Sequence, residues 1–166
     1  MLQVPDAEAT LEALAERMRG AVAFDAALVG IYSGGAWLAE RLVAMIPGSH
    51  PIGFIDVSFY RDDYARTGLK SGVKRSELPF DVNGARIVLV DDVLYTGRSV
   101  RAAINELFDY GRPDAIELAV LIDRGGRELP VEPTYCGARL AVARELSVVL
   151  TREAGRLKLG VEQASP

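Results

Sequence analysis

Two adjacent acids and the short turn after them are the residues of this chain best suited to chemistry. Asp91 and Asp92 follow the apolar run Ile87 to Val90, and the turn Thr96 to Ser99 leads into a helix-like segment. Free backbone N–H groups and the positive end of a helix dipole make such a turn an anion site. Gly97 permits a positive φ and the close approach of a phosphate, while the hydroxyl groups and the guanidinium add donors. The turn therefore predicts a phosphate site.

The two acids need a different partner, because carboxylates repel a bare phosphate. A ribose diol donates hydrogen bonds to carboxylates, and Mg²⁺ prefers carboxylate and phosphate oxygens together. A phosphorylated ribose with Mg²⁺ would satisfy all of these groups. Alternatively, Thr96 only caps a helix and the acids only end a strand, but the complete pattern favours a ligand site. It matches neither the Walker A loop nor the dinucleotide-binding fingerprint.

The segment Ile87 to Ser99 resembles the phosphoribosyl diphosphate (PRPP) motif of the type I phosphoribosyltransferases. Extended through Ala103, it is similar to the PyrR proteins, which are bifunctional pyrimidine-operon regulators and uracil phosphoribosyltransferases. The resemblance runs in order from about Ala27 to Tyr135. Three other segments carry it: Ser58 to Asp63, Tyr110 to Pro113 and Leu121 to Pro130.

This resemblance implies one α/β domain over residues 1–166, with the type I phosphoribosyltransferase fold and a mainly parallel sheet flanked by helices. It also implies a mobile lid loop at 62–79, which would close over PRPP and exclude water. A small hood over the base would include residues 123–135. We expect the tail 163–166 to be disordered.

The apolar pattern supports this fold independently of the resemblance. Strand-like and helix-like segments alternate, which predicts a parallel sheet with crossover connections, and ligands bind such sheets beyond the carboxyl ends of the strands. Helices are predicted over Ala7 to Val22, Gly34 to Met45 and Thr96 to Tyr110. Strands are predicted over Ala26 to Tyr32, Ile52 to Tyr60, Arg86 to Val90 and Ala115 to Ile122, with a closing hairpin of Ser147 to Leu150 and Arg156 to Val161.

The resemblance also implies roles for residues at four strand ends. Asp91 and Asp92 would position the ribose and Mg²⁺, and Arg61 in the lid would be its main phosphate contact; these three are the expected catalytic residues. Asp123 and Arg124 would bind the base. The implied contacts of PRPP and UMP are Ser33, Gly34, Val93, Leu94, Tyr95, Thr96, Gly97, Arg98 and Ser99.

Several positions depart from the family pattern. Ser33-Gly34-Gly35, the implied pyrophosphate loop, stands where many relatives have Thr-Arg-Gly, and Gly126 stands where His is common. Tyr95 occupies about the place where some related transferases carry an acid, so no residue stands out as the general base. Catalysis would then depend mainly on positioning. We expect Arg127 and Glu128 to be exposed turn charges.

The implied reaction joins uracil to PRPP and gives UMP and diphosphate. A second hypothesis is a regulator of pyrimidine-operon leader RNA whose nucleotide site senses UMP or UTP, with weak or absent transfer activity. A third is a transferase for another base, because backbone groups in a hood discriminate poorly. A phosphoacceptor receiver domain fits less well, since its acid pair normally comes early in the chain. Candidate RNA contacts are Arg17, Arg19, Arg139, Arg144, Arg152 and Arg156.

Bulk properties limit the possible partners and compartments. A net charge of −4 and a pI of about 5.1 argue against indiscriminate nucleic-acid binding. No apolar run reaches transmembrane length, and no basic region with an apolar core begins the chain. The single cysteine, Cys136, fits a cytoplasmic protein and a packing role. Assembly of relatives implies a homodimer or a larger homo-oligomer.

Overall fold

Five parallel strands form the central sheet. The computed structural model describes residues 2–58 and 76–166, and its sheet has the order β2-β1-β3-β4-β5. Every neighbouring pair in this sheet is parallel, so the carboxyl ends of the strands lie at one edge. The strands are β1 (Ala27–Ile31), β2 (Ile52–Ile55), β3 (Arg86–Leu94), β4 (Ala115–Asp123) and β5 (Tyr135–Arg139).

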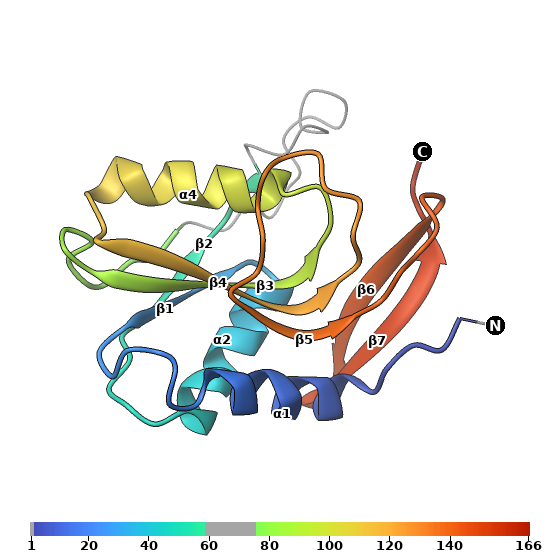
Figure 1. Cartoon of the computed structure of the whole chain (residues 1–166), viewed down its shortest axis with the longest axis horizontal. Coiled ribbons are helices and arrows are strands. Elements are labelled where there is room, and N and C mark those ends of the chain that lie inside the picture. Colours follow the sequence, from blue (N-terminus) through green and yellow to red (C-terminus); the bar gives the residue numbers. More distant parts are fainter. Residues whose placement is uncertain (1, 59–75) are drawn as a thin grey trace.

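Helices cover both faces of the sheet, which a parallel sheet requires because its strands are apolar on both sides. Helices α1 (Ala7–Met18) and α2 (Gly34–Met45) lie on one face, and α4 (Arg98–Tyr110) lies on the other (Figure 1). One apolar cluster includes Leu14 of α1, and a second includes Leu107 of α4. This confirms the predicted α/β fold. No helix within the described ranges is long and apolar enough to cross a membrane.

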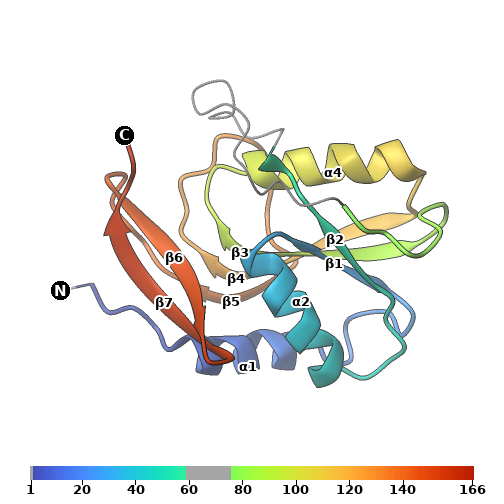
Figure 2. The ribbon, with the colours of Figure 1, turned by 180° about the vertical axis from the view of Figure 1, so that it is seen from behind.

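The predicted closing hairpin is present and stands beside the sheet (Figure 2). Its strands are β6 (Leu146–Glu153) and β7 (Arg156–Gln163). Glu8 of α1 anchors it, since Oε1 of Glu8 accepts the N–H of Leu157 at 2.9 Å and Oε2 accepts Nη2 of Arg41 at 2.7 Å. The hydrogen bonds from Arg41 and then from Leu157 hold the pKa of Glu8 below its usual value.

Two helices differ in length from the prediction. α1 ends at Met18, earlier than predicted, because the backbone of the next residue, Arg19, is already non-helical with a ψ of 127°. α4 begins at Arg98, later than predicted, because Gly97 has a φ of +94°. A right-handed helix does not continue through such a backbone conformation.

Two strands also differ from the prediction. β3 continues through both acids to Leu94, because β4 pairs with it as far as Asp123. β2 ends at Ile55, where Oδ1 of Asp56 accepts the N–H of Ser58 at 2.9 Å and turns the backbone. The last two residues of that predicted strand, 59 and 60, lie outside the described ranges.

The sequence did not predict the edge strand β5. The segment Tyr135–Arg139 is short, contains a glycine and follows a proline-rich stretch, so it has little strand character of its own. Gly137 nevertheless fits its place closely, since a Cβ there would lie 2.6 Å from the carbonyl oxygen of Leu121 and 2.8 Å from the Thr10 side chain. Contacts with β4 and α1 therefore define this strand.

The first two residues of the predicted disordered tail, 163 and 164, have defined backbone contacts. Gln163 is the last residue of β7, and the N–H of Ala164 donates to the carbonyl oxygen of Glu145 at 2.8 Å. The predicted disorder therefore does not hold for these two residues.

Gly30 of β1 gives a test of the packing between the sheet and α2. A Cβ at this position would lie 2.6 Å from the carbonyl oxygen of Gly35 and 2.7 Å from Cα of Ala36. We expect Gly30→Ala to lower the free energy of unfolding by about 1–3 kcal/mol, as overpacking does, in urea denaturation. The control is Gly160→Ala in β7, where a Cβ would meet nothing within 4 Å, with an expected change within about 0.5 kcal/mol. Equal stability of the two variants would contradict the close packing.

Candidate functional site

The carboxyl ends of β1, β3 and β4 meet at one edge of the sheet. The register pairs Gly30 with Val90 and Leu94 with Asp123, so the loops after these strands start from neighbouring positions. Ligands bind parallel sheets at this edge. The structure places there the predicted site residues that it describes: Ser33, Gly34, Asp91, Asp92, Val93, Leu94, Tyr95, Thr96, Gly97, Arg98, Ser99, Asp123 and Arg124.

The two acids at the end of β3 differ in exposure. Asp91 is 7% exposed, whereas Asp92 is partly exposed. Oδ1 of Asp91 accepts the N–H of Asp92 at 2.9 Å, and Oδ1 of Asp92 accepts the N–H of Val93 at 2.8 Å. These bonds orient both carboxylates at the strand end. A diol or a cation can therefore approach Asp92 more readily than Asp91.

The loop between β1 and α2 lies directly against Asp92. A Cβ on Gly34 would be 2.8 Å from Cγ of Asp92, which is closer than real side-chain atoms approach. The lack of a side chain at Gly34 therefore lets the backbone of this loop lie over the carboxylate, and a larger residue here would require Asp92 to shift. The peptide bond Tyr32–Ser33 in the same loop is cis. The predicted pyrophosphate loop and the predicted metal-binding acid are thus in contact.

The turn after β3 has the geometry of an anion site. Gly97 caps α4 in a left-handed conformation, and the N–H of Arg98 donates to Oγ1 of Thr96 at 3.2 Å. The first turn of α4 has no acidic residue that would neutralise the positive end of its dipole. A hollow of about 130 Å³ lies at this turn. Its lining consists of Asp91, Val93, Leu94, Tyr95, Thr96, Gly97, Arg98, Ser99 and Val100.

The loop after β4 holds this turn from the outside. The carbonyl oxygen of Thr96 accepts the N–H groups of Glu128 at 2.9 Å and of Leu129 at 3.0 Å. The ion pair between Arg98 and Glu128 is longer, at 3.8 Å, and both side chains are substantially exposed, so it contributes little. Backbone hydrogen bonds from the loop 124–131 are therefore the main support of the turn.

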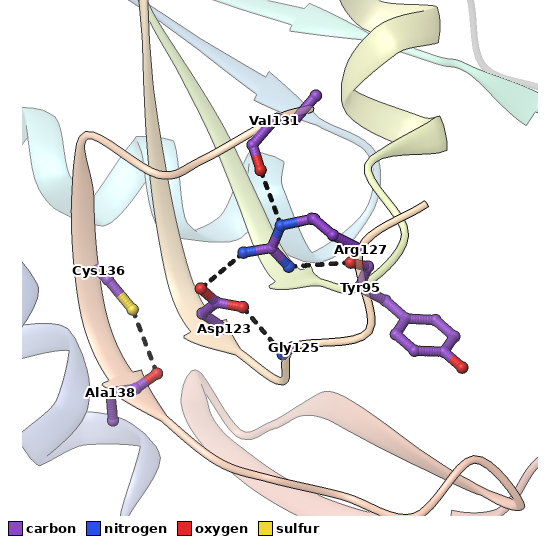
Figure 3. Close-up of polar contacts among 7 residues, drawn as sticks. All are labelled: Tyr95, Asp123, Gly125, Arg127, Val131, Cys136 and Ala138. Carbon is purple, nitrogen blue, oxygen red and sulfur yellow. Dashed lines mark hydrogen bonds and ion pairs between the residues drawn. The ribbon is translucent and has the colours of Figure 1, made fainter. Parts of the chain in front are cut away.

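Arg127, which we expected to be an exposed turn charge, is part of a half-buried network (Figure 3). Its Nη2 donates to Oδ2 of Asp123 at 2.7 Å, its Nη1 to the carbonyl oxygen of Tyr95 at 2.9 Å, and its Nε to the carbonyl oxygen of Val131 at 2.8 Å. The prediction was wrong because the loop folds back over the end of β4, which the local sequence does not indicate.

Asp123 is 6% exposed and ionised in this network. Its Oδ1 accepts the N–H of Gly125 at 3.0 Å. Burial alone would raise the pKa of Asp123, but the hydrogen bonds from Arg127 and Gly125, together with the nearby positive charges, hold that pKa below its usual value. The pair is therefore charged at neutral pH.

Arg124 is buried without an acidic partner among the described residues. Its Nη1 donates to the carbonyl oxygen of Leu146 at 2.7 Å and its Nη2 to that of Ala143 at 3.1 Å, while its Nε has no hydrogen-bond partner within residues 2–58 and 76–166. The guanidinium carbon lies 3.9 Å from the centre of the Tyr95 ring, a cation–π contact. A Cβ on Gly126 would be 2.5 Å from Cε2 of Tyr95. The Tyr95 ring is therefore in contact with the Arg124 guanidinium and lies close to the Gly126 backbone.

The roles predicted for the site residues all stay predictions. Asp123 and Arg124 have protein partners for their charged groups, and their binding of a base is not tested by these contacts. Arg61, the predicted phosphate contact, lies outside the described residues, as does most of the predicted lid loop at 62–79.

Two other side chains are as expected. Cys136 donates from Sγ to the carbonyl oxygen of Ala138 at 3.3 Å, and burial raises the pKa of its thiol. A thiol of this kind packs and is a poor nucleophile at neutral pH. Glu128 is exposed, with half of its side-chain surface accessible, as predicted for a turn charge.

A metal ion at this site would need ligands beyond the protein. Within residues 2–58 and 76–166, no group of three or more His, Cys, Asp or Glu side chains could hold a metal ion. Two carboxylates supplemented by phosphate oxygens and water are nevertheless a typical Mg²⁺ environment. Asp91 and Asp92 fit this donor set.

Known proteins resemble this chain over most of its length. The phosphoribosyl transferase domain family matches residues 2–138. The bifunctional protein PyrR of Ralstonia nicotianae is 53% identical over 152 residues, which cover 89% of this chain and 87% of that protein. The bifunctional protein PyrR of Pseudomonas paraeruginosa is 51% identical over 122 residues, which cover 74% and 72%.

Solved structures share the fold. A hypoxanthine-guanine phosphoribosyltransferase from Bacillus anthracis has a TM-score of 0.67 at 19% identity, covering 85% of this chain and 86% of that one. A purine phosphoribosyltransferase from Pyrococcus horikoshii has a TM-score of 0.59 at 29% identity, covering 80% and 81%. The likeness at 19% identity concerns the fold alone. With half of its aligned residues in common with the PyrR proteins and the fold of the phosphoribosyltransferases, the chain belongs to the PyrR family of phosphoribosyltransferases.

Proposed function

We propose that the chain transfers the phosphoribosyl group of PRPP to uracil and releases UMP and diphosphate. One observation carries this proposal: the acid pair at the end of β3 lies between the turn of residues 95–99, named the phosphate turn here, and the glycine loop after β1. An anion site on each side of two carboxylates suits a ribose that carries phosphate at one end and pyrophosphate at the other.

Each part of the site has a role in this proposal. The turn Thr96 to Ser99 binds the 5′-phosphate through N–H and hydroxyl groups, and Ser33 with Gly34 binds the pyrophosphate. Asp91 and Asp92 bind the ribose diol and stabilise positive charge that develops on the ring as the bond to pyrophosphate breaks. Mg²⁺, held by these two acids and by oxygens of PRPP, would neutralise the departing pyrophosphate.

Base binding is proposed at the loop after β4. Arg124 stacks on the Tyr95 ring, and Asp123 is linked to the carbonyl oxygen of Tyr95 through Arg127. Backbone groups of this loop can pair with the edge of a planar base. The single histidine, His50, lies away from the site, with its Nδ1 2.7 Å from the carbonyl oxygen of Ala26 and its Nε2 3.0 Å from that of Pro47. We therefore assign the reaction mainly to positioning and electrostatic stabilisation.

A second function, nucleotide-dependent RNA binding, is favoured by one hollow at the edge of the sheet. Its volume is about 500 Å³, and Arg17 of α1 and Arg139 of β5 both line it. Two other candidates have protein partners: Arg19 bonds the carbonyl oxygen of Met45, and Arg152 lies over the Trp37 ring. Because Arg17 and Arg139 line the same hollow, we propose them as the phosphate contacts of the RNA.

We further propose a cytoplasmic homodimer or larger homo-oligomer. The lone cysteine supports a reducing compartment. Sedimentation of the purified chain gives its mass in solution directly.

A transfer assay tests the base. PRPP is supplied with uracil, orotate, adenine, guanine or hypoxanthine, and the nucleotide products are separated. We expect UMP as the main product. Turnover of purines alone would overturn the choice of base while leaving phosphoribosyl transfer intact.

Asp92→Asn tests the acid pair. The amide keeps the shape but removes the charge that faces the ribose, so we expect kcat/KM to fall about a hundredfold, with unchanged urea denaturation. The control is Asp109→Asn on the exposed face of α4, which removes the same charge far from the site and should leave kcat/KM unchanged. Wild-type kinetics for Asp92→Asn would contradict its role.

A filter-binding titration tests RNA binding. Leader RNA is titrated with and without UMP, and the slope of log Kd against log salt is measured. We expect Arg17→Gln with Arg139→Gln to weaken binding and to reduce the slope by about one or two counter-ions. Arg86→Gln, which removes an exposed charge at the opposite end of β3, is the control. An RNA affinity that is the same with and without UMP would contradict this function.

A further inference from the structure

Arg127 joins three segments of chain through one guanidinium (Figure 3). It bonds the carboxylate of Asp123 at the end of β4, the carbonyl oxygen of Tyr95 in the phosphate turn, and the carbonyl oxygen of Val131 on the far side of the loop. The three acceptors lie 2.7–2.9 Å from three different nitrogens. The rigid, planar fork of arginine meets such a set of acceptors, and the point charge of lysine does not.

Burial makes these bonds a fixed feature of the site. The Asp123 side chain is 7% exposed and that of Arg127 is 23% exposed. Loss of either partner would leave a charge in poorly solvated surroundings, which is costly. By contrast, the nearby pair of Arg98 and Glu128 is exposed and longer, so it contributes little to the stability of the loop.

The same loop also holds the next residue of the phosphate turn. The carbonyl oxygen of Thr96 accepts two N–H groups, from Glu128 and Leu129. Together with the Arg127 bond to Tyr95, these contacts attach two successive carbonyls of the turn to the loop after β4. The turn therefore cannot shift without moving that loop.

We infer that Arg127 is a positioning residue that makes the 5′-phosphate site and the base site a single unit. This inference rests on the proposed function, which assigns the turn to the phosphate and the loop after β4 to the base. Arg127 acts through Tyr95 and Asp123 and needs no contact with either substrate. PRPP that orders the turn also orders the loop for the base.

The kinetic test compares Arg127→Gln, Arg127→Lys and the control Arg86→Gln, which removes an exposed charge at the amino end of β3. Arg127→Gln loses the charged fork that makes all three bonds. We expect the KM values of PRPP and uracil both to rise about tenfold, because the phosphate turn and the loop after β4 are then held less firmly. Arg127→Lys keeps the charge beside Asp123 but lacks the fork, so its KM values should be intermediate. Arg86→Gln should match the wild type.

Amide hydrogen exchange distinguishes a local effect of Arg127 on the phosphate turn from a general loss of protein stability. Amides of residues 93–99 should exchange faster in Arg127→Gln and in Asp123→Asn, while those of β1 should keep their wild-type rates. A lower melting temperature with unchanged KM values would overturn the inference, and so would KM values within twofold of wild type with unchanged exchange. If Arg127→Gln does not fold, the same KM and exchange outcomes in Arg127→Lys test the inference. For Asp123→Asn only the exchange rates are used, because Asp123 is itself a proposed base contact.

A calorimetric titration with ribose 5-phosphate distinguishes failure of the positioning role of Arg127 from failure of the proposed reaction. If the wild type makes no UMP from uracil, the proposed reaction fails, but ribose 5-phosphate should still bind the turn. In that case Arg127→Gln should weaken its binding about tenfold relative to Arg86→Gln. Equal affinities for the two variants would refute the positioning role by itself.

Discussion

The parallel pairing of β3 between β1 and β4 is the constraint on which the site depends. Because strands paired in parallel end at the same edge, the loops after all three must emerge side by side. β3 is paired with β4 as far as Leu94, so Asp91 and Asp92 are held by a sheet and not by a loop. The acids therefore have fixed directions, while the flanking loops supply the anion-binding backbone.

The close approach of these loops depends on glycines, which have no side chain, at positions 30 and 34. The backbone at Gly34 lies over the Asp92 carboxylate, and Gly30 accepts the start of α2. Each contact is too short for a Cβ, so the layers meet at backbone distance. This closeness brings the N–H groups at the start of α2 near the acids, and a ligand that contains both anions and hydroxyl groups can bridge the two.

Charges beside the phosphate turn are buried and therefore restrict its geometry. Arg124 donates to the carbonyl oxygens of Ala143 and of Leu146 at the start of β6, and it stacks on Tyr95. The pair of Asp123 and Arg127 spans the adjacent loop. Burying a charge is costly unless hydrogen bonds compensate for it, so few arrangements of these loops are permitted. These hydrogen bonds hold the phosphate turn in one conformation. Catalysis by positioning requires such a fixed turn.

The sequence by itself determined the elements whose signals lie within a few residues: the phosphate turn, helix α2 with its predicted bounds, and the closing hairpin. Apolar periodicity and glycine positions are local, so they can be recognised without a fold. Only the tertiary structure decided that Tyr135–Arg139 is a strand, because β4 supplies its hydrogen bonds. It also decided that Arg127 is a partner of Tyr95 and Asp123 and not a surface charge. Contacts of this kind arise when a loop closes over a neighbouring strand end, and no periodicity in the sequence encodes that closure.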